Sequence, residues 1–297
     1  MSRTSRTRTF PVVIALSTAA LLAGSGRSFA DTAAPAEHAA TFPFTGPRPT
    51  IPLMLGERGP FVFILDTGAS GSVVDSTFAA ELAMPVTGTA YVSSPIGDRV
   101  ERATVSLASI TAGSLALPDV PATALDLQRL FGADGPVGVL SPASLDGFLV
   151  TFDYSERRIT IARGALPEPD GAEVFGYPAN VRLPELPATV AGQAFVVSVD
   201  TGSPGGLTLP YEVRETLPWV GELTVVGRVG LVDKEVELYG AQLDGNATIG
   251  TVELARPQVE LMPGLPKGNV GRRFLEGRVL TMDATHRRIR LTSTAQG

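Results

Sequence analysis

Residues 61–68 read FVFILDTG, and residues 195–202 read FVVSVDTG. Each is a short, largely apolar run that ends in Asp-Thr-Gly, so Asp66 and Asp200 stand at the same point of one pattern that occurs twice. Such a run predicts a buried strand, and an aspartate at its end then lies at the edge of the core. One Asp-Thr-Gly is weak evidence, because its ordinary role is a surface turn. Two at matched places indicate a shared site.

Two further pairs of segments match in the same order. Val137-Gly138 is matched by Val270-Gly271, and residues 153–161 are matched by residues 283–291. In this alignment, the segment after the second Val-Gly is three residues shorter than the segment after the first. The spacing between the copies changes little from one matched pair to the next. A nearly constant spacing predicts two copies of one structural unit.

The composition favours an all-β protein. The 24 prolines and 32 glycines are spread between short apolar runs, which is typical of many strands joined by tight turns. Helices are expected only at residues 76–84, capped by Asp75 or Ser76 and ended by Pro85, and at residues 272–276. The chain has no cysteine and a formal net charge of −6. This excludes thiol chemistry and gives no sign of a nucleic-acid partner.

The first thirty residues have the pattern of an export signal. Three arginines within the first eight residues precede an apolar run over residues 10–24, and Ser28-Phe29-Ala30 offers small residues for cleavage after Ala30. We therefore expect a periplasmic or secreted protein that does not contact the membrane once the signal is removed. An uncleaved N-terminal anchor is the alternative.

Composition also suggests the boundaries of the parts. We expect a signal peptide at residues 1–30, a flexible leader at 31–44, an N-terminal unit at 45–164, a linker at 165–186 and a C-terminal unit at 187–297. The linker assignment rests on the prolines and acidic residues that interrupt any regular pattern there.

The paired aspartates suggest hydrolytic chemistry. Burial makes a lone carboxylate costly to ionise, and a second carboxylate beside it raises that cost, so Asp66 and Asp200 are expected to hold one proton between them. The ionised partner can then accept a proton from water while the protonated partner polarises a carbonyl group. Two pairs of residues would support the turns: Gly68 and Gly202, which let the backbone fold beneath the carboxyl groups, and Thr67 and Thr201, whose hydroxyls can join the two turns.

Residues 61–70, Val137-Gly138 and residues 150–161 resemble the retropepsin-like and pepsin-like aspartic peptidases, in particular bacterial single-chain forms with two retropepsin-like units. The resemblance implies an acid protease fold of two β-barrel-like lobes, related by a pseudo-twofold axis, with a cleft between them. It implies both aspartates at the floor of the cleft, no metal or other cofactor, and a hairpin flap over the substrate. By position it adds four residues: Ala69 and Ser203 in the active-site turns, and Gly97 and Gly230 as flap candidates, for which ordinary hairpins are the alternative.

We therefore expect an exported, monomeric aspartic endopeptidase whose partner is a peptide or protein substrate. The alternative is a non-catalytic peptide-binding protein, since the second turn reads Ser203-Pro204 where the first reads Ala69-Ser70. A Ser-His-Asp triad or a histidine metal site finds little support, because the chain has only two histidines. A glycosidase would hold its carboxylates farther apart.

Overall fold

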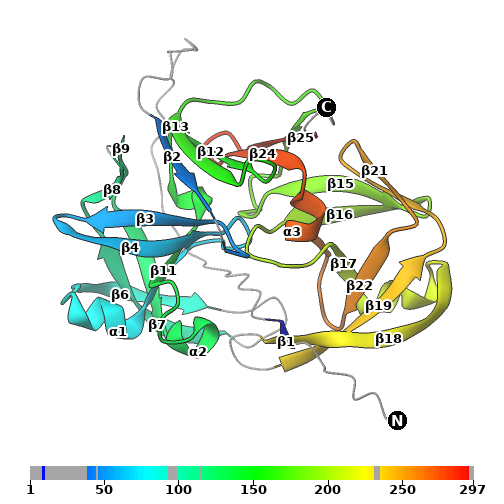
Figure 1. The fold of residues 1–297 in the computed structure, drawn as a ribbon, viewed down its shortest axis with the longest axis horizontal. Coiled ribbons are helices and arrows are strands. Elements are labelled where there is room, and N and C mark those ends of the chain that lie inside the picture. Colours follow the sequence, from blue (N-terminus) through cyan, green and yellow to red (C-terminus); the bar gives the residue numbers. More distant parts are fainter. Residues whose placement is uncertain are drawn as a thin grey trace.

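The computed structural model describes residues 9–10, 39–44, 46–92, 99–113, 115–230 and 235–293. Strands dominate these residues and form three sheets, with few and short helices (Figure 1). The all-β class expected from the sequence is confirmed.

The N-terminal half forms a nine-stranded sheet. Its strand order is β6-β7-β10-β5-β11-β4-β3-β8-β9. In chain order the strands are β3 (Thr50–Leu55), β4 (Arg58–Leu65), β5 (Ser72–Asp75), β6 (Val86–Val92), β7 (Val100–Leu107), β8 (Ile110–Ala112), β9 (Leu115–Ala116), β10 (Val120–Leu125) and β11 (Gly138–Leu140).

The C-terminal half contributes most of a ten-stranded sheet, in the order β1-β18-β19-β22-β17-β23-β16-β15-β20-β21. Its strands are β1 (Thr9–Phe10), β15 (Glu185–Val190), β16 (Gln193–Val199), β17 (Leu207–Pro210), β18 (Trp219–Gly230), β19 (Glu235–Leu243), β20 (Asn246–Ile249), β21 (Val252–Ala255), β22 (Gln258–Met262) and β23 (Gly268–Val270).

The same four-strand arrangement occurs in both sheets. In one, β10, β5, β11 and β4 are neighbours; in the other, β22, β17, β23 and β16 are neighbours. Corresponding pairs also run in the same sense: β4 is parallel to β11 as β16 is to β23, and β5 is antiparallel to β11 as β17 is to β23. Because β4 and β16 lead into the Asp-Thr-Gly turns, the two turns are held by equivalent neighbours.

The strand register corrects one of the sequence matches. Gly138 lies opposite Phe63, and Gly268 lies opposite Val197, so Gly138 corresponds to Gly268 and not to Gly271. With this pairing the spacing between the copies is the same as in the block that begins at Asp153, and the apparent shortening by three residues disappears. A short Val-Gly pair was too common a pattern to fix the alignment.

A third, six-stranded sheet joins the two halves, and the sequence did not predict it. Its order is β14-β25-β24-β12-β13-β2. The strands are β2 (Ala39–Pro43), β12 (Phe148–Asp153), β13 (Arg158–Arg163), β14 (Val174–Gly176), β24 (Arg278–Asp283) and β25 (Arg288–Ser293). The hairpins β12–β13 and β24–β25 each offer an open edge, and β12 pairs antiparallel with β24. Among the described residues none of the three sheets closes into a barrel, unlike the barrel-like lobes that we expected.

Two expected boundaries differ from the observed strands. Residues 39–43 were placed in the flexible leader but form β2, because they pair with the edge of β13 and Thr41 hydrogen-bonds to Thr160. Residues 174–176 were placed in the linker but form β14, paired with β25. In both places a free edge strand provides hydrogen-bond partners that the sequence pattern does not reveal.

Helices occur where the sequence indicated them, with three other short turns. Helix α1 (Ser76–Glu81) is capped by Asp75, which accepts a hydrogen bond from the Phe78 amide at 3.0 Å, and α3 (Arg272–Leu275) falls in the second expected segment. The others are α2 (Gln128–Phe131), η1 (Pro142–Ser144) and η2 (Tyr211–Glu215).

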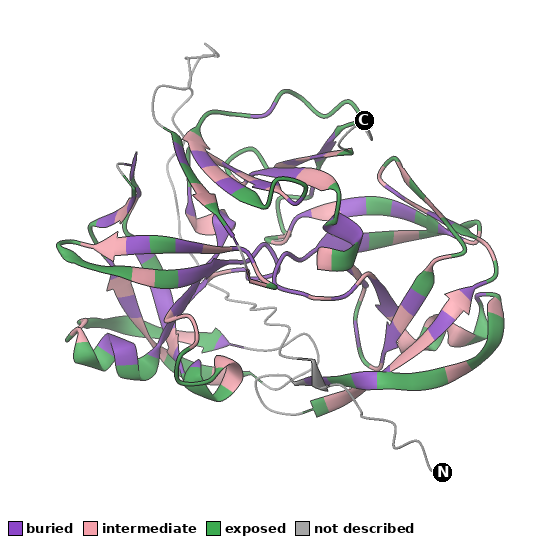
Figure 2. Ribbon diagram, viewed as in Figure 1, coloured by how far each residue is buried: buried purple, intermediate pink, exposed green. Residues whose placement is uncertain are grey.

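The largest apolar cluster runs through all three sheets and contains Phe63, Phe152 and Leu280, which are fully buried. Figure 2 shows buried residues concentrated where the two halves meet, and exposed residues toward the outer ends of the hairpins. The turns that carry Asp66 and Asp200 are therefore supported by tightly packed, buried strands.

Some expectations fall outside the described residues. Of the expected signal peptide only Thr9 and Phe10 are described, as β1 beside β18. The remainder of that segment, residues 31–38 and Gly97 lie outside. Within the described part of the chain, no helix has both the length and the apolar character needed to span a membrane.

Candidate active site

The two Asp-Thr-Gly turns meet at the junction of the two halves. Asp66 follows β4, and its amide donates to the Leu140 carbonyl at 3.2 Å. Asp200 follows β16, and its amide donates to the Val270 carbonyl at 2.9 Å. Both aspartates are 4% exposed. Their positions are thus fixed by the ends of buried strands, as expected from the apolar runs that precede them.

The threonines of the turns join the two halves by four hydrogen bonds. The Thr67 amide donates to Thr201 Oγ1, and the Thr201 amide donates to Thr67 Oγ1, each at 3.0 Å. The hydroxyls in turn donate across the junction: Thr67 to the Val199 carbonyl at 2.7 Å, and Thr201 to the Leu65 carbonyl at 2.9 Å. This reciprocal network fixes the separation of the aspartates.

Gly68 and Gly202 lie directly against the aspartates of the opposite turn. A Cβ at Gly68 would overlap the Asp200 carboxyl group, and a Cβ at Gly202 would overlap that of Asp66. Only glycine therefore allows the two carboxyl groups to approach one another here.

The two carboxyl groups accept hydrogen bonds from backbone amides and share one of these donors. Asp66 Oδ1 accepts from the amides of Gly68 at 2.7 Å and Gly202 at 3.2 Å. Asp200 Oδ1 accepts from the amides of Gly202 and Ser203, both at 2.9 Å. The Gly202 amide thus donates to an oxygen of each carboxyl group, so the two groups lie side by side. Two buried carboxyl groups this close are expected to hold one proton between them.

The environment assigns that proton to Asp66. Burial raises the pKa of Asp66 well above its usual range, and the neighbouring Asp200 charge raises it further. Burial also raises the pKa of Asp200, but hydrogen bonds from Asp66 and the amides of Ser203 and Gly202 oppose the change. Donors directed at a carboxylate favour its ionised form. These donors make Asp200 the partner that ionises more readily.

The turn residues Ala69 and Ser203 take equivalent places. The Ala69 amide donates to the Asp66 carbonyl at 3.3 Å, and the Ser203 amide donates to the Asp200 carbonyl at 3.2 Å. The carbonyl of Ala69 accepts from Ser141 Oγ at 2.5 Å, whereas the carbonyl of Ser203 accepts from the Arg272 amide at 2.8 Å. Ser203-Pro204 thus keeps the turn in place by a different bond.

Two residues at the site were missed by sequence reasoning. Arg48 Nε donates to the Gly202 carbonyl at 3.1 Å, and its guanidinium lies over the Phe131 ring. Asn269 Nδ2 lies 3.5 Å from Asp200 Oδ2. Arg48 stands in a proline-rich stretch without periodic pattern, and Asn269 was hidden because the sequence alignment paired its surroundings three residues out of register.

Of the two flap candidates, Gly230 lies within the described residues and Gly97 does not. Gly230 is the last residue of β18 and pairs with Glu235, and the residues that connect them lie outside the described part of the chain. Gly97 lies between β6 and β7, whose last described pair is Val92 with Val100. The position of either tip relative to the aspartates stays a prediction.

Of the two histidines, only His286 lies within the described residues. It is exposed in the turn between β24 and β25, and its Nδ1 lies 2.9 Å from Asp283 Oδ2. His38 lies outside the described residues. In the part of the chain that the structure covers, no cluster of three or more His, Cys, Asp or Glu could bind a metal ion.

Comparison with known proteins agrees with this geometry for the N-terminal half. Residues 51–141 match the family model described as Aspartyl protease. The matched segment runs from β3 to just past β11 and includes Asp66, Thr67 and Gly68, but not Asp200. No curated protein matches the chain. The match supports an aspartic peptidase family and a peptidase-like function.

Proposed function

We propose that this chain is an exported aspartic endopeptidase that hydrolyses peptide bonds with a water molecule activated between Asp66 and Asp200. The observation that carries the proposal is a pair of buried carboxyl groups that accept from the same Gly202 amide, where two Asp-Thr-Gly turns are hydrogen-bonded to each other. The family match at residues 51–141 supports the same reaction class.

In the proposed mechanism, Asp200 is the general base and Asp66 the general acid. A water molecule attacks the carbonyl carbon of the scissile bond while its proton passes to Asp200, and Asp66 gives its proton to the carbonyl oxygen. The tetrahedral intermediate then breaks its C–N bond. Asp200 protonates the leaving amine, and a hydroxyl of the intermediate returns a proton to Asp66. The pair ends in the protonation state in which it began.

The first prediction is that Asp66→Asn and Asp200→Asn each stop hydrolysis. A carboxamide can neither accept the proton of water nor exchange roles with its partner, and the double variant should lose little more than either single one. The measurement is cleavage of an unstructured peptide library from acidic to neutral pH. Peptide binding without cleavage by the wild type at any pH would instead favour the non-catalytic peptide-binding protein. Equal cleavage by wild type and variants would exclude these aspartates as the catalytic pair.

Export is part of the same proposal. The basic, apolar and small-residue regions of residues 1–30 support removal of this segment after Ala30. N-terminal sequencing of the protein from its native host tests it, and a product that still carries Met1 contradicts it.

A further inference from the structure

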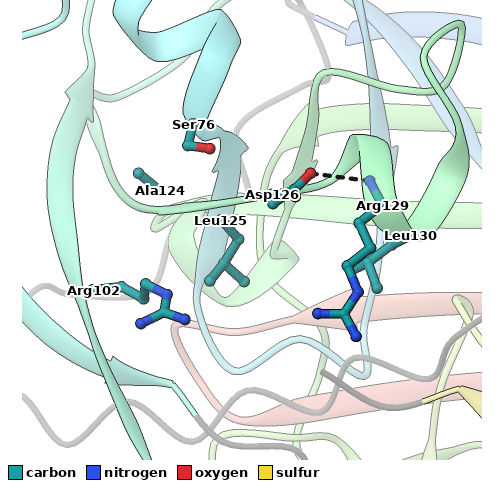
Figure 3. Close-up of a pocket in the computed structure, with 7 residues that line it drawn as sticks. All are labelled: Ser76, Arg102, Ala124, Leu125, Asp126, Arg129 and Leu130. Carbon is teal, nitrogen blue, oxygen red and sulfur yellow. Dashed lines mark hydrogen bonds between the residues drawn. The ribbon is translucent and has the colours of Figure 1, made fainter. Parts of the chain in front are cut away.

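A pocket of about 210 Å³ lies in the N-terminal half, away from the aspartate pair. It is bounded by the start of α1, by β7, by the end of β10 and by α2 (Figure 3). Its lining residues are Ser76, Arg102, Ala124, Leu125, Asp126, Arg129 and Leu130. The floor is apolar and the walls carry two positive charges, so the pocket suits a group with an apolar stem and an anionic end.

Arg102 and Arg129 line the pocket on either side of Leu125 (Figure 3). Both are exposed, and neither makes an ion pair with a carboxylate among the residues that the structure describes. Arg102 donates only to the adjacent Glu101 carbonyl, at 2.9 Å. A guanidinium group in the lining of a pocket can bind a carboxylate in a fork geometry, which a lysine cannot reproduce, and this pocket has two such groups.

The acidic residue that lines the pocket, Asp126, is hydrogen-bonded to the backbone. Asp126 Oδ1 accepts from the Arg129 amide at 3.0 Å, at the start of α2 (Figure 3). Its carboxylate is therefore held by the backbone, and two positive charges face one negative charge around the pocket. A net positive pocket stands out in a chain whose formal net charge is −6.

The pocket is linked to the aspartate pair through α2. Arg129 and Leu130 line the pocket, and the next residue, Phe131, contacts Arg48, which hydrogen-bonds to Gly202 beneath Asp66. Leu130 also packs against the apolar cluster that contains Ala69.

We propose that this pocket binds an acidic side chain of the peptide substrate, on one side of the scissile bond. The proposal rests on the proposed function, since it names the substrate class of the same enzyme: peptides that carry a glutamate or aspartate on one side of the bond that is cut. The apolar floor receives the methylene stem, and the carboxylate lies between the two guanidinium groups.

The test uses the full mature chain with Asp66→Asn, so that binding is measured without cleavage. Short unstructured peptides in which one glutamate is moved along a neutral sequence are each compared with their glutamine counterpart. At one position the glutamate peptide should bind on the order of tenfold more tightly. Arg102→Gln with Arg129→Gln should remove that difference and leave the affinity of the glutamine peptide unchanged. Raised salt should weaken only the glutamate peptide.

Arg58→Gln is the matched control, because Arg58 is an exposed arginine on the same half, at the far end of the β3–β4 hairpin. It should keep the preference for glutamate. Glutamate and glutamine peptides that bind equally at every position overturn the proposal, as does a preference that survives loss of both arginines. If the wild type cleaves nothing but the preference behaves as expected, the peptidase proposal fails and the acidic-side-chain pocket stands.

Discussion

The surroundings of the two aspartates differ at one residue that contacts only Asp200. Asn269 Nδ2 lies 3.5 Å from Asp200 Oδ2. By strand register, the corresponding residue of the N-terminal half is Val139, which cannot donate a hydrogen bond. Asn269 therefore favours the ionised form of Asp200 alone, and we assign it a positioning role for the proton of the pair.

Asn269→Val, which copies the residue of the other half, is expected to move the acidic limb of the pH profile of kcat/KM. The amide lowers the pKa of Asp200, so its loss raises that pKa. Because the proposed mechanism needs Asp200 ionised, the limb should move to higher pH. Val139→Ala is the matched control and should leave the limb in place. A fall in kcat/KM at all pH values without a shift would indicate a merely structural role.

Asp66→Asn is also expected to change the pH dependence of stability. Burial and the neighbouring Asp200 charge raise the pKa of Asp66 in the folded state, whereas an aspartate in the unfolded chain has a pKa of about 4. As pH rises above that value, the unfolded wild type releases this proton and the folded protein keeps it, so wild-type stability falls. Asparagine has no proton to release. The variant should melt with the wild type at about pH 3 and on the order of 3 °C above it at neutral pH.

Thermal unfolding by circular dichroism across this pH range measures the effect. Asp134→Asn, a change at an exposed aspartate, serves as control and should follow the wild type at every pH. A variant that is less stable than the wild type at neutral pH would contradict the assigned protonation of the pair.

For individual residues, the sequence predicted the aspartates and their turns because each is the end of a repeated pattern. Thr67 and Thr201 were predicted for the same reason. Arg48 and Asn269 were not predicted, because each is a single polar residue whose partner is far away in the sequence. Arg48 contacts Gly202 of the other half, and Asn269 contacts Asp200, which follows β16. Contacts of that kind depend on the fold and leave no local periodic signal.

Among the elements, β4 and β16 illustrate what a local pattern can predict. Both are strands that end immediately before the aspartates, as their apolar runs indicated. Helix α1 likewise begins after its capping Asp75. In each case the information lies within a few consecutive residues, so the sequence alone was enough.

The pairing of β12 with β24 could not be predicted from such a local pattern. Residues 148–153 alternate in burial, and such alternation predicts a strand but does not say which edge it pairs with. The partner strand comes from the other half of the chain, and Thr151 and Thr281 face one another with their hydroxyl oxygens 3.0 Å apart. We expected two β-barrel-like lobes and did not predict a sheet shared between them. The pairing of β12 with β24 joins the halves instead.

For the whole molecule, the two halves are connected at two separate places. One is the reciprocal threonine network beneath the aspartates, and the other is the six-stranded sheet. The main apolar cluster continues through both. Loss of either half would leave buried strand edges and apolar surface without a partner, so the halves are expected to unfold together.

Leu280→Ala tests this coupling, because Leu280 is fully buried in β24 and lies opposite Phe152 of the N-terminal half. The change should reduce the free energy of unfolding by about 2–5 kcal/mol, through lost burial and the cavity left behind. If the halves are coupled, calorimetry should show one transition at lower temperature. The fluorescence of the single tryptophan, Trp219 in the C-terminal half, should then change together with loss of hydrogen-exchange protection in β4 of the N-terminal half.

Thr160→Ala in β13 of the six-stranded sheet is the control. The Thr160 hydroxyl makes an exposed contact with Thr41, so its loss should lower the melting temperature much less. Two transitions, with β4 protected after Trp219 has responded, would show that the halves are independent and that the shared sheet does not hold the aspartate pair together.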